Sequence, residues 1–263
     1  MKSQSAAGQP QGAKAPVGGS AAHAVASVGV CSIDHLVIVA QNLDQGMQWC
    51  EATLGISPSP GGEHKLFGTH NRLFKIATPA NPMAYCEIIA INSNATPTIK
   101  PGTKRWFDMD NAALQAAVAV QPRLVHFVAN TPDVQAACAA HSELHIDRGP
   151  ALQASRHTNK GMLLWQITVR EDGQRLFNGM LPTLIQWGKP DDKEPLRLHP
   201  RNSLPRSGVT LHSITSVHPE ASALQAAYAA IGLQGVGVQE GSANLTATLQ
   251  TPKGLVTLTS QGF

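Results

Sequence analysis

Three segments decide the fold: IDHLVIV at 33–39, GGEHKLFGTHN at 61–71 and YCEIIAI at 85–91. The first and last are short apolar runs rich in β-branched residues, which is typical of strands buried on both faces. Each carries one side chain that can bind a metal, His35 in the first run and Glu87 in the last. The middle segment concentrates glycine and histidine. We expect the three segments to line one cleft, with the rest of the chain forming its other wall.

The residues around these segments predict a strand, a helix and three further strands. Asn42 can cap a helix in which apolar side chains recur at helical spacing, at Leu43, Met47, Cys50 and Leu54. The strand candidates on either side are short and apolar, and they are separated by glycine- and proline-containing turns. This part of the chain therefore reads as one strand–helix–three-strand module.

The same order of elements begins again with the apolar run RLVHFVA at 123–129. His126 in this run lies 91 positions after His35. Thr131 followed by Pro132 is typical of a helix start, and three strand candidates come after that helix. The repeated order predicts a second module like the first.

The predicted fold class is α+β, with paired βαβββ modules and a third, partial module at the C-terminus. The N-terminal residues are mostly Ala, Gly, Ser, Gln and Pro, which is typical of a disordered tail, and they lack the apolar segment of a signal peptide. The predicted parts are a tail at 1–30, a first module at 31–100, a second at 101–188, a polar linker at 189–207 and a partial βα-type module at 208–263.

Composition excludes several classes of protein. The formal net charge is +3 over 263 residues and no run of basic residues occurs, so no footprint for nucleic acid is present. No apolar stretch approaches the ~20 residues that span a bilayer. The four cysteines show no CxxC spacing, which favours free thiols in a cytoplasmic protein. Nucleotide-binding loops, GxSxG and HExxH are also missing.

Five stretches of the chain carry a resemblance to a known family: IDHLVIVAQNLDQGMQW, LGISPSPGGEHKLFGTHN, YCEIIAI, LPTLIQWG and TPKGLVTL. Together with the doubled module they resemble the vicinal oxygen chelate superfamily, which includes glyoxalase I, extradiol dioxygenases and antibiotic-sequestering proteins. More narrowly, the chain is similar to the glyoxalase-like domain proteins of that superfamily. The resemblance implies that two curled half-sheets enclose a metal cleft.

The resemblance also implies a set of metal ligands on the first and fourth strands of each module. By position these are His35 and Glu87 in module one and His126 in module two, while Gln186 stands where many relatives carry a carboxylate. Two imidazoles and one carboxylate suit Fe(II), Mn(II), Zn(II) or Ni(II). Such a metal would polarise a carbonyl or enediolate oxygen. A shift of one residue in the strand would instead turn Glu87 to solvent.

Other side chains are candidates for contact with a substrate. His64 is the catalytic candidate, as a proton shuttle, substrate contact or extra ligand. Asn71, His70, Arg156 and Gln186 are the substrate-binding candidates. The alternative is that the glycines serve only turns, that both histidines are exposed, that Asn71 caps the turn and that Arg156 lies at the surface.

The expected function is a glyoxalase-like, divalent-metal-dependent enzyme that acts on a small oxygenated molecule by lyase, isomerase or dioxygenase chemistry. One alternative is a non-catalytic protein that sequesters a small molecule in the same cleft, and another is a scaffold with a vestigial site. The expected partner is a small-molecule substrate, without nucleic acid or membrane. The modules pair either within one chain or across a homodimer.

Overall fold

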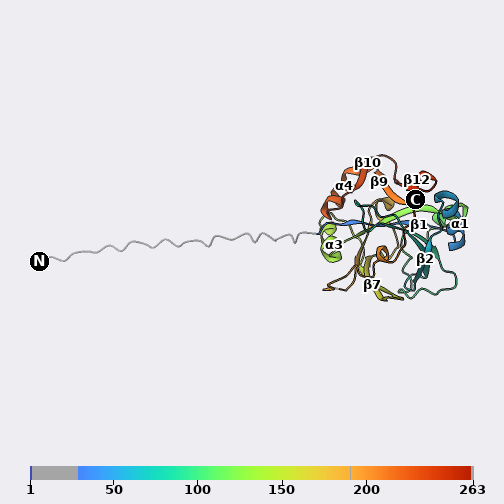
Figure 1. The fold of residues 1–263 in the computed structure, drawn as a ribbon. Coiled ribbons are helices and arrows are strands. Elements are labelled where there is room, and N and C mark those ends of the chain that lie inside the picture. Colours follow the sequence, from blue (N-terminus) through green and yellow to red (C-terminus); the bar gives the residue numbers. More distant parts are fainter. Residues whose placement is uncertain (2–28, 190, 262–263) are drawn as a thin grey trace.

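The computed structural model describes Met1, residues 29–189 and residues 191–261. Most of the tail expected at 1–30 therefore lies outside the described residues. The folded part contains one eight-stranded sheet and one four-stranded sheet, with helices packed around them (Figure 1). Among the described residues no helix is both long enough and apolar enough to cross a membrane.

The first module has the predicted order of elements. Asn42 begins its helix by accepting a hydrogen bond from the backbone N–H of Gln45, and Gly55 ends it in a left-handed conformation with φ of 76°. The elements are β1 (Ser32–Val39), α1 (Leu43–Leu54), β2 (Ser59–His64), β3 (Thr69–Lys75) and β4 (Tyr85–Ile91).

The second module repeats this order after a short extra helix. Its elements are α2 (Ala112–Val120), β5 (Arg123–Asn130), α3 (Val134–Ser142), β6 (Ala151–Thr158), β7 (Gly161–Thr168), the 3-10 turn η1 (Leu176–Gly179) and β8 (Thr183–Trp187). The strand order of the large sheet is β2-β3-β4-β1-β5-β8-β7-β6. In each module the fourth strand runs parallel beside the first, and the modules join through antiparallel β1 and β5. The predicted α+β fold with paired βαβββ modules is confirmed, and the modules pair within one chain.

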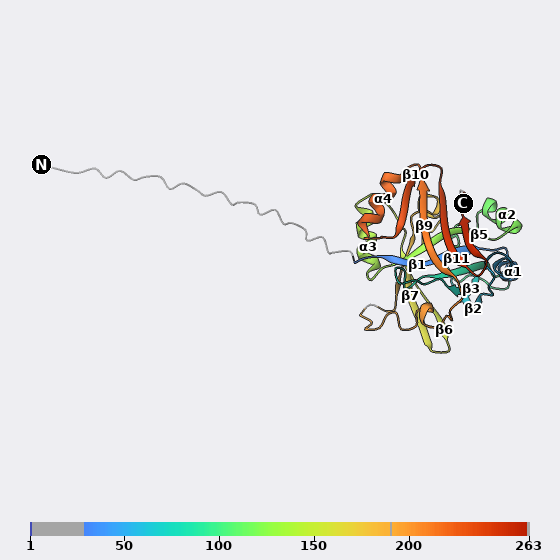
Figure 2. The same cartoon turned by 45° about the horizontal axis from the view of Figure 1, so that its top comes forward.

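The C-terminal strands form the smaller sheet. A 3-10 turn η2 (Pro200–Asn202) precedes β9 (Thr210–His218), α4 (Ala221–Ala230), β10 (Val236–Glu240), β11 (Asn244–Thr251) and β12 (Gly254–Thr259). Their order, β10-β9-β11-β12, differs from that of the two modules, because the second strand lies beside the first. β10 was not expected from the sequence, since it is short and largely exposed. The small sheet covers one face of the large one (Figure 2).

Side chains along β1 point alternately to two buried surfaces on opposite faces of the large sheet. Leu36 and Ile38 pack in a core shared with the small sheet, whereas Val37 and Val39 pack in a second core on the opposite face. The candidate site lies on the second face. At Asp34 the pairing of β1 with β5 shifts by one residue, so a β-bulge interrupts the alternation there.

Gly46 allows α1 to lie close to the sheet, and this generates a prediction. A Cβ at this position would lie 2.5 Å from Cγ2 of Ile88 and 3.3 Å from Cβ of Ala40. Overpacking of this kind costs about 1–3 kcal/mol, against a helix-propensity gain of about 1 kcal/mol for alanine. We therefore expect Gly46→Ala to lower the free energy of unfolding by about 1–2 kcal/mol in urea denaturation.

Gly237→Ala in β10 is the matched control, because the nearest heavy atom to its added Cβ lies at 3.4 Å. We expect this variant to stay within about 0.5 kcal/mol of the wild type. A Gly46→Ala protein as stable as the wild type would mean that α1 does not approach β4 this closely.

Candidate active site

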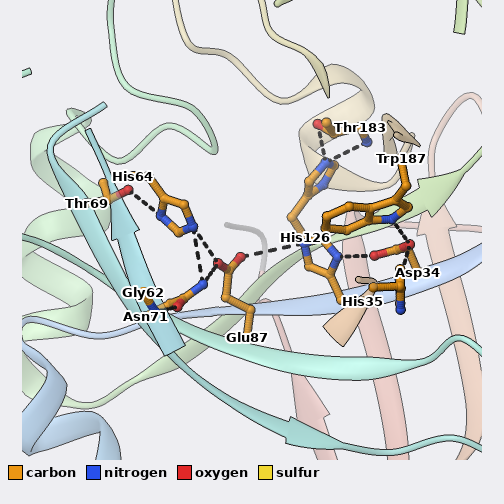
Figure 3. Close-up of polar contacts among 11 residues, drawn as sticks. Asp34, His35, Gly62, His64, Thr69, Asn71, Glu87, His126, Thr183 and Trp187 are labelled. Atoms are coloured by element: carbon orange, nitrogen blue, oxygen red, sulfur yellow. Dashed lines mark hydrogen bonds and ion pairs between the residues drawn. The ribbon is translucent and has the colours of Figure 1, made fainter. Parts of the chain in front are cut away.

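An aspartate and a histidine adjacent in the sequence form the centre of the site. Because of the bulge in β1, the Asp34 carboxylate and the His35 ring meet, with Nδ1 of His35 at 2.7 Å from Oδ1 of Asp34. Nδ1–H must donate, since a carboxylate can only accept. In neutral His35 this leaves the lone pair on Nε2, which lies 3.6 Å from Oε2 of Glu87 (Figure 3).

Asp34 is fully buried and accepts two further hydrogen bonds. Its Oδ2 lies 2.8 Å from Nε1 of Trp187 and 3.1 Å from Nε2 of His199. Nδ1 of His199 accepts the backbone N–H of Arg201, so Nε2 of His199 carries the proton that Asp34 receives. Burial favours the neutral acid, but the interactions with His199 and His35 outweigh it and hold the pKa of Asp34 below its ordinary value. Asp34 therefore remains a carboxylate that orients His35.

A second polar group surrounds Glu87. Oδ1 of Asn71 accepts the backbone N–H of Gly62 at 2.8 Å, which directs the Asn71 amide Nδ2 to Oε1 of Glu87 at 2.5 Å. The same Nδ2 lies 3.3 Å from Nε2 of His64, and Nδ1 of His64 lies 3.0 Å from the Thr69 hydroxyl. The network assigns Nδ1–H as the donor of His64 and leaves Nε2 as an acceptor. Nε2 of His64 is 3.8 Å from Glu87.

His64 is held in its neutral form. Burial lowers the pKa of His64 to about 4, opposed by Glu87 and aided by the charge of Arg156. Nε2 of His35 and Nε2 of His64 thus both lie close to the Glu87 carboxylate, at 3.6 and 3.8 Å, and Nε2 of His64 already accepts from Asn71.

These side chains line a small inner cavity of about 40 Å³, room for a few waters. A larger cleft of about 600 Å³ adjoins it and shares His64, Trp106 and Trp165. The first module supplies the polar wall of the inner cavity, and the second module and the 189–207 segment supply most of the apolar wall. That second wall comprises Leu163, Trp165, Ile167, Ile185, Trp187 and Pro200.

Arg156 from β6 is the charged group on the second module's side of the cavity. Its Nη1 is buried and has no hydrogen-bond partner. A Cβ on Gly62 would lie 2.2 Å from this Nη1, so the glycine allows the guanidinium to reach the site. Neither Gly62 nor Gly61 adopts a positive φ, so close approach, and not a left-handed turn, explains the GG pair.

His126 does not line the inner cavity. Its Nδ1 lies 2.7 Å from the carbonyl oxygen of Gly179, and Nε2 accepts the N–H of Thr183 at 3.0 Å and lies 3.1 Å from the Thr183 hydroxyl. Burial, aided by the charge of Arg175, lowers the pKa of His126 to about 3. His126 is therefore a neutral core histidine with both ring nitrogens in use.

Strand register explains this difference between the modules. Val37 in β1 lies opposite Glu87 in β4, and the matching residue of β5, Val128, lies opposite Thr183 in β8. Thr183 is thus the second module's counterpart of Glu87, and its contact with His126 corresponds to that of Glu87 with His35. Gln186 is three residues further along.

Gln186 does not line the inner cavity, although its neighbours Ile185 and Trp187 do. Its Oε1 accepts the backbone N–H of Val134 at 2.8 Å and so caps helix α3. His70 likewise faces away, because it is adjacent to Asn71 on β3 and side chains alternate along a strand. The structure therefore brings His35, His64, Asn71, Glu87 and Arg156 together, but not His126, Gln186 or His70.

The expected metal ligands do not fit a metal as a set. His126 has no free ring nitrogen, and freeing Nε2 would leave the groups of Thr183 without their partner. In the part of the chain that the structure describes, no group of three or more His, Cys, Asp or Glu side chains is arranged to hold a metal ion.

Sequence reasoning missed Asp34, Trp187 and His199 as parts of the site. In a regular strand Asp34 would point away from His35, and only its position in a DH pair could have drawn attention to it. Trp187 lies in a predicted strand, where a tryptophan is more often a core residue than part of a site. His199 lies in a polar stretch that was expected to be a linker, yet its ring is completely buried.

The fold and the site define a protein of two paired βαβββ modules with a polar centre between them. The chain belongs to the glyoxalase-like domain family, whose sequence profile matches residues 33–232. This match confirms the resemblance to the vicinal oxygen chelate superfamily. No curated protein matches the chain.

Solved structures align with the chain at low sequence identity. A hypothetical protein from Staphylococcus aureus aligns with a TM-score of 0.57 and 16% identity, covering 81% of this chain and 87% of that chain. Methylmalonyl-CoA epimerase from Streptomyces coelicolor aligns with a TM-score of 0.38 and 15% identity, covering 60% of this chain and 98% of that one. Methylmalonyl-CoA epimerase from Mycobacterium tuberculosis aligns with a TM-score of 0.35 and 15% identity, covering 62% of this chain and 91% of that one. At 16% identity, the likeness to the Staphylococcus aureus protein shows the fold alone.

The neutral state of His64 predicts a loss of stability in acid. Its pKa of about 4 in the fold lies below the ordinary value of about 6.5, so the unfolded chain binds more protons between these pH values. The stability that neutral His64 contributes to the fold is fully present above pH ~6.5 and is lost as the pH falls toward ~4. At ~1.4 kcal/mol per pKa unit, the loss in unfolding free energy amounts to up to about 3 kcal/mol. We expect His64→Gln to show a shallower fall in unfolding free energy between pH 7.5 and 4.5 in urea denaturation.

His212→Gln is the control, since this histidine is exposed, and it should keep the wild-type pH profile. His126 and His141, whose pKa values are lowered to about 3 and about 4, keep part of the acid lability in every variant. An unchanged slope in His64→Gln would show that His64 is not held neutral.

Proposed function

We propose that the protein is an enzyme that removes and returns a proton on a small oxygenated molecule, chemistry of the isomerase or lyase type. The observation that carries this proposal is the oriented pair of Asp34 and His35. A buried carboxylate fixes Nδ1–H of His35, and Nε2 with its lone pair faces a cavity. A histidine held in this way by a carboxylate is suited to act as a general base.

In the proposed reaction, Nε2 of His35 takes a proton from a carbon next to a carbonyl group. The electrons of the C–H bond form the carbon–carbon double bond of an enolate, and the carbonyl π electrons move to the oxygen. Asp34 stabilises the imidazolium that forms. The proton then returns to the same or a neighbouring carbon in an isomerisation, or a group leaves from the adjacent carbon in a lyase reaction.

Arg156 and His64 have proposed roles on either side of the reacting carbon. The buried, unpartnered Nη1 of Arg156 would donate to the developing enolate oxygen, where a fixed positive charge in a closed site is most effective. His64, neutral at pH 7, would accept a hydrogen bond from a substrate hydroxyl in place of its 3.3 Å contact with Asn71, whose amide stays bonded to Glu87. His64 also lies between the inner cavity and the larger cleft, where the rest of the substrate would bind.

The dioxygenase alternative requires a redox-active metal, and the expected ligand set does not fit one, because both nitrogens of His126 are in use. The proton-transfer chemistry proposed here depends only on residues of this chain. The four cysteines are free, which supports a reducing, cytoplasmic location.

A non-catalytic binding protein remains the second candidate. It is favoured by the cleft of about 600 Å³, whose walls include Phe67, Trp106 and Trp165. Aromatic walls of this kind suit a flat apolar ligand. In that case replacing His35 would leave the dissociation constant of a ligand unchanged.

The proposal predicts hydrogen exchange catalysed by His35. The protein is incubated in D2O with a panel of small 2-hydroxy and 2-oxo carbonyl compounds, and loss of the Cα–H signal is followed by proton NMR. Parallel samples contain added Fe(II), Mn(II), Zn(II) or Ni(II). We expect exchange on at least one compound, lowered at least about 100-fold in His35→Asn, because a positioned general base contributes 10²–10⁴-fold.

His212→Asn, at an exposed position, is the matched control and should exchange at the wild-type rate. Asp34→Asn should also slow exchange, since the amide no longer fixes the His35 tautomer. Exchange that persists in His35→Asn would remove His35 as the base. Exchange that appears only with added metal would restore the metal-dependent alternative.

A further inference from the structure

A second buried arginine lies outside the candidate active site. Arg148 is 6% exposed and follows helix α3. Its Nε donates to Nδ1 of His141, and its Nη1 donates to the carbonyl oxygen of Pro182 at 2.6 Å. Its Nη2 is buried and has no hydrogen-bond partner. The guanidinium is thus fixed by two neutral acceptors, and one donor group is left over.

Arg148 has no negative charge beside it. Among the described residues none of the ion pairs of arginine or lysine with a carboxylate includes Arg148. The acidic groups that interact electrostatically with Arg148 are the thiols of Cys138 and Cys31 and the phenol of Tyr228. Burial raises the pKa of all three. They are neutral at pH 7, so the charge of Arg148 is uncompensated.

His141 does not supply the missing charge either. Its Nε2 lies 2.8 Å from the carbonyl oxygen of Ala227, so Nε2–H donates there and Nδ1 accepts from Arg148. Burial lowers the pKa of Arg148 to about 10, which still leaves it charged at pH 7. Burying a cation without a partner costs several kcal/mol, so a counter-charge is expected.

A cavity of about 20 Å³ lies against Arg148. Arg170 and Arg175 line it as well, and no Asp or Glu is among its lining residues. Those two arginines already have carboxylate partners outside the cavity: Arg170 pairs with Asp147 and Asp172, and Arg175 with Asp108.

Trp106, which lines this cavity and both cavities of the candidate site, carries a second unpaired donor. It is 4% exposed, it lines this cavity, and its Nε1 is buried without a hydrogen-bond partner. Thr168 and Thr183 add hydroxyl groups to the lining. Three arginines and a tryptophan therefore line this cavity, and no acidic residue does.

We propose that this cavity binds a small inorganic monovalent anion of the chloride class. The volume admits one or two particles the size of water, for which about 10–15 Å³ each is needed, and it is too small for an organic acid. Water could satisfy the unpaired donors but would leave the charge of Arg148 uncompensated. An anion satisfies both requirements.

The proposed anion lies behind the wall of the candidate active site. Trp106 and Phe107 line both this cavity and the inner cavity beside His35. Thr183, also in the lining, bonds His126. An anion that binds the folded state and not the unfolded chain would stabilise the fold and fix this wall. At an anion concentration of 100 times the dissociation constant, it would shift the unfolding equilibrium about 100-fold.

Bromide is the direct probe. Crystals of the full chain are soaked in sodium bromide, and anomalous differences are measured at the bromine edge. We expect a peak within hydrogen-bond distance of Nη2 of Arg148. Only water density at this position, or bromide only at surface sites, would overturn the proposal.

Thermal unfolding gives the solution test. We expect a higher Tm in sodium chloride than in sodium gluconate at equal ionic strength, because gluconate is too large for the cavity. Gln174→Glu, which places a carboxylate at an exposed position of the lining, should abolish this difference. Arg148→Met should abolish it too, if the variant folds.

Arg206→Met, at an exposed site, is the control and should keep the chloride effect. Equal Tm values in the two salts for the wild type, or a chloride effect that survives in Gln174→Glu, would contradict the proposed site.

Discussion

The carboxylate of Asp34 joins parts of the chain that are far apart in the sequence. It accepts hydrogen bonds from His35 beside it, from Trp187 at the end of β8 and from His199 in the segment after that strand. A buried charge is tolerated only where such donors surround it. Module one, module two and the 189–207 segment must therefore meet at this point, and the orientation of His35 depends on their meeting.

The two modules share a backbone plan but use it differently. In module one, Nε2 of His35 lies 3.6 Å from Oε2 of Glu87, beyond hydrogen-bond distance, and both side chains line a cavity. In module two the corresponding residues, His126 and Thr183, are in direct hydrogen-bond contact. A closed pair of this kind stabilises the core and has no bonding capacity left for a ligand. The polar site is consequently asymmetric, with its catalytic candidates on one module and Arg156 with the apolar wall on the other.

Buried arginines mark the second module in two places. Arg156 directs an unpaired donor toward the inner cavity, and Arg148 leaves one unpaired on the far side of Trp106 and Phe107. Both positions combine positive charge with unused donors, which favours negatively charged or electron-rich oxygen ligands at the first and a small anion at the second. The aromatic pair between them separates the reaction site from the proposed anion site.

The sequence by itself determined the module plan and the polar face of module one. Apolar runs, caps and glycine positions predicted the strand–helix–three-strand order twice, and His64, Asn71, Glu87 and Arg156 were recognisable as candidates. These signals are local, since each depends on residues within a few positions.

Tertiary structure decided the rest. The bulge at Asp34 turned that side chain to His35, and the pairing of β5 with β8 placed Thr183, not Gln186, at the register of Glu87. His199 reached Asp34 only because the segment after β8 folds back over the site. Such contacts depend on strand register and on the packing of distant segments, which a side-chain period of two residues cannot specify.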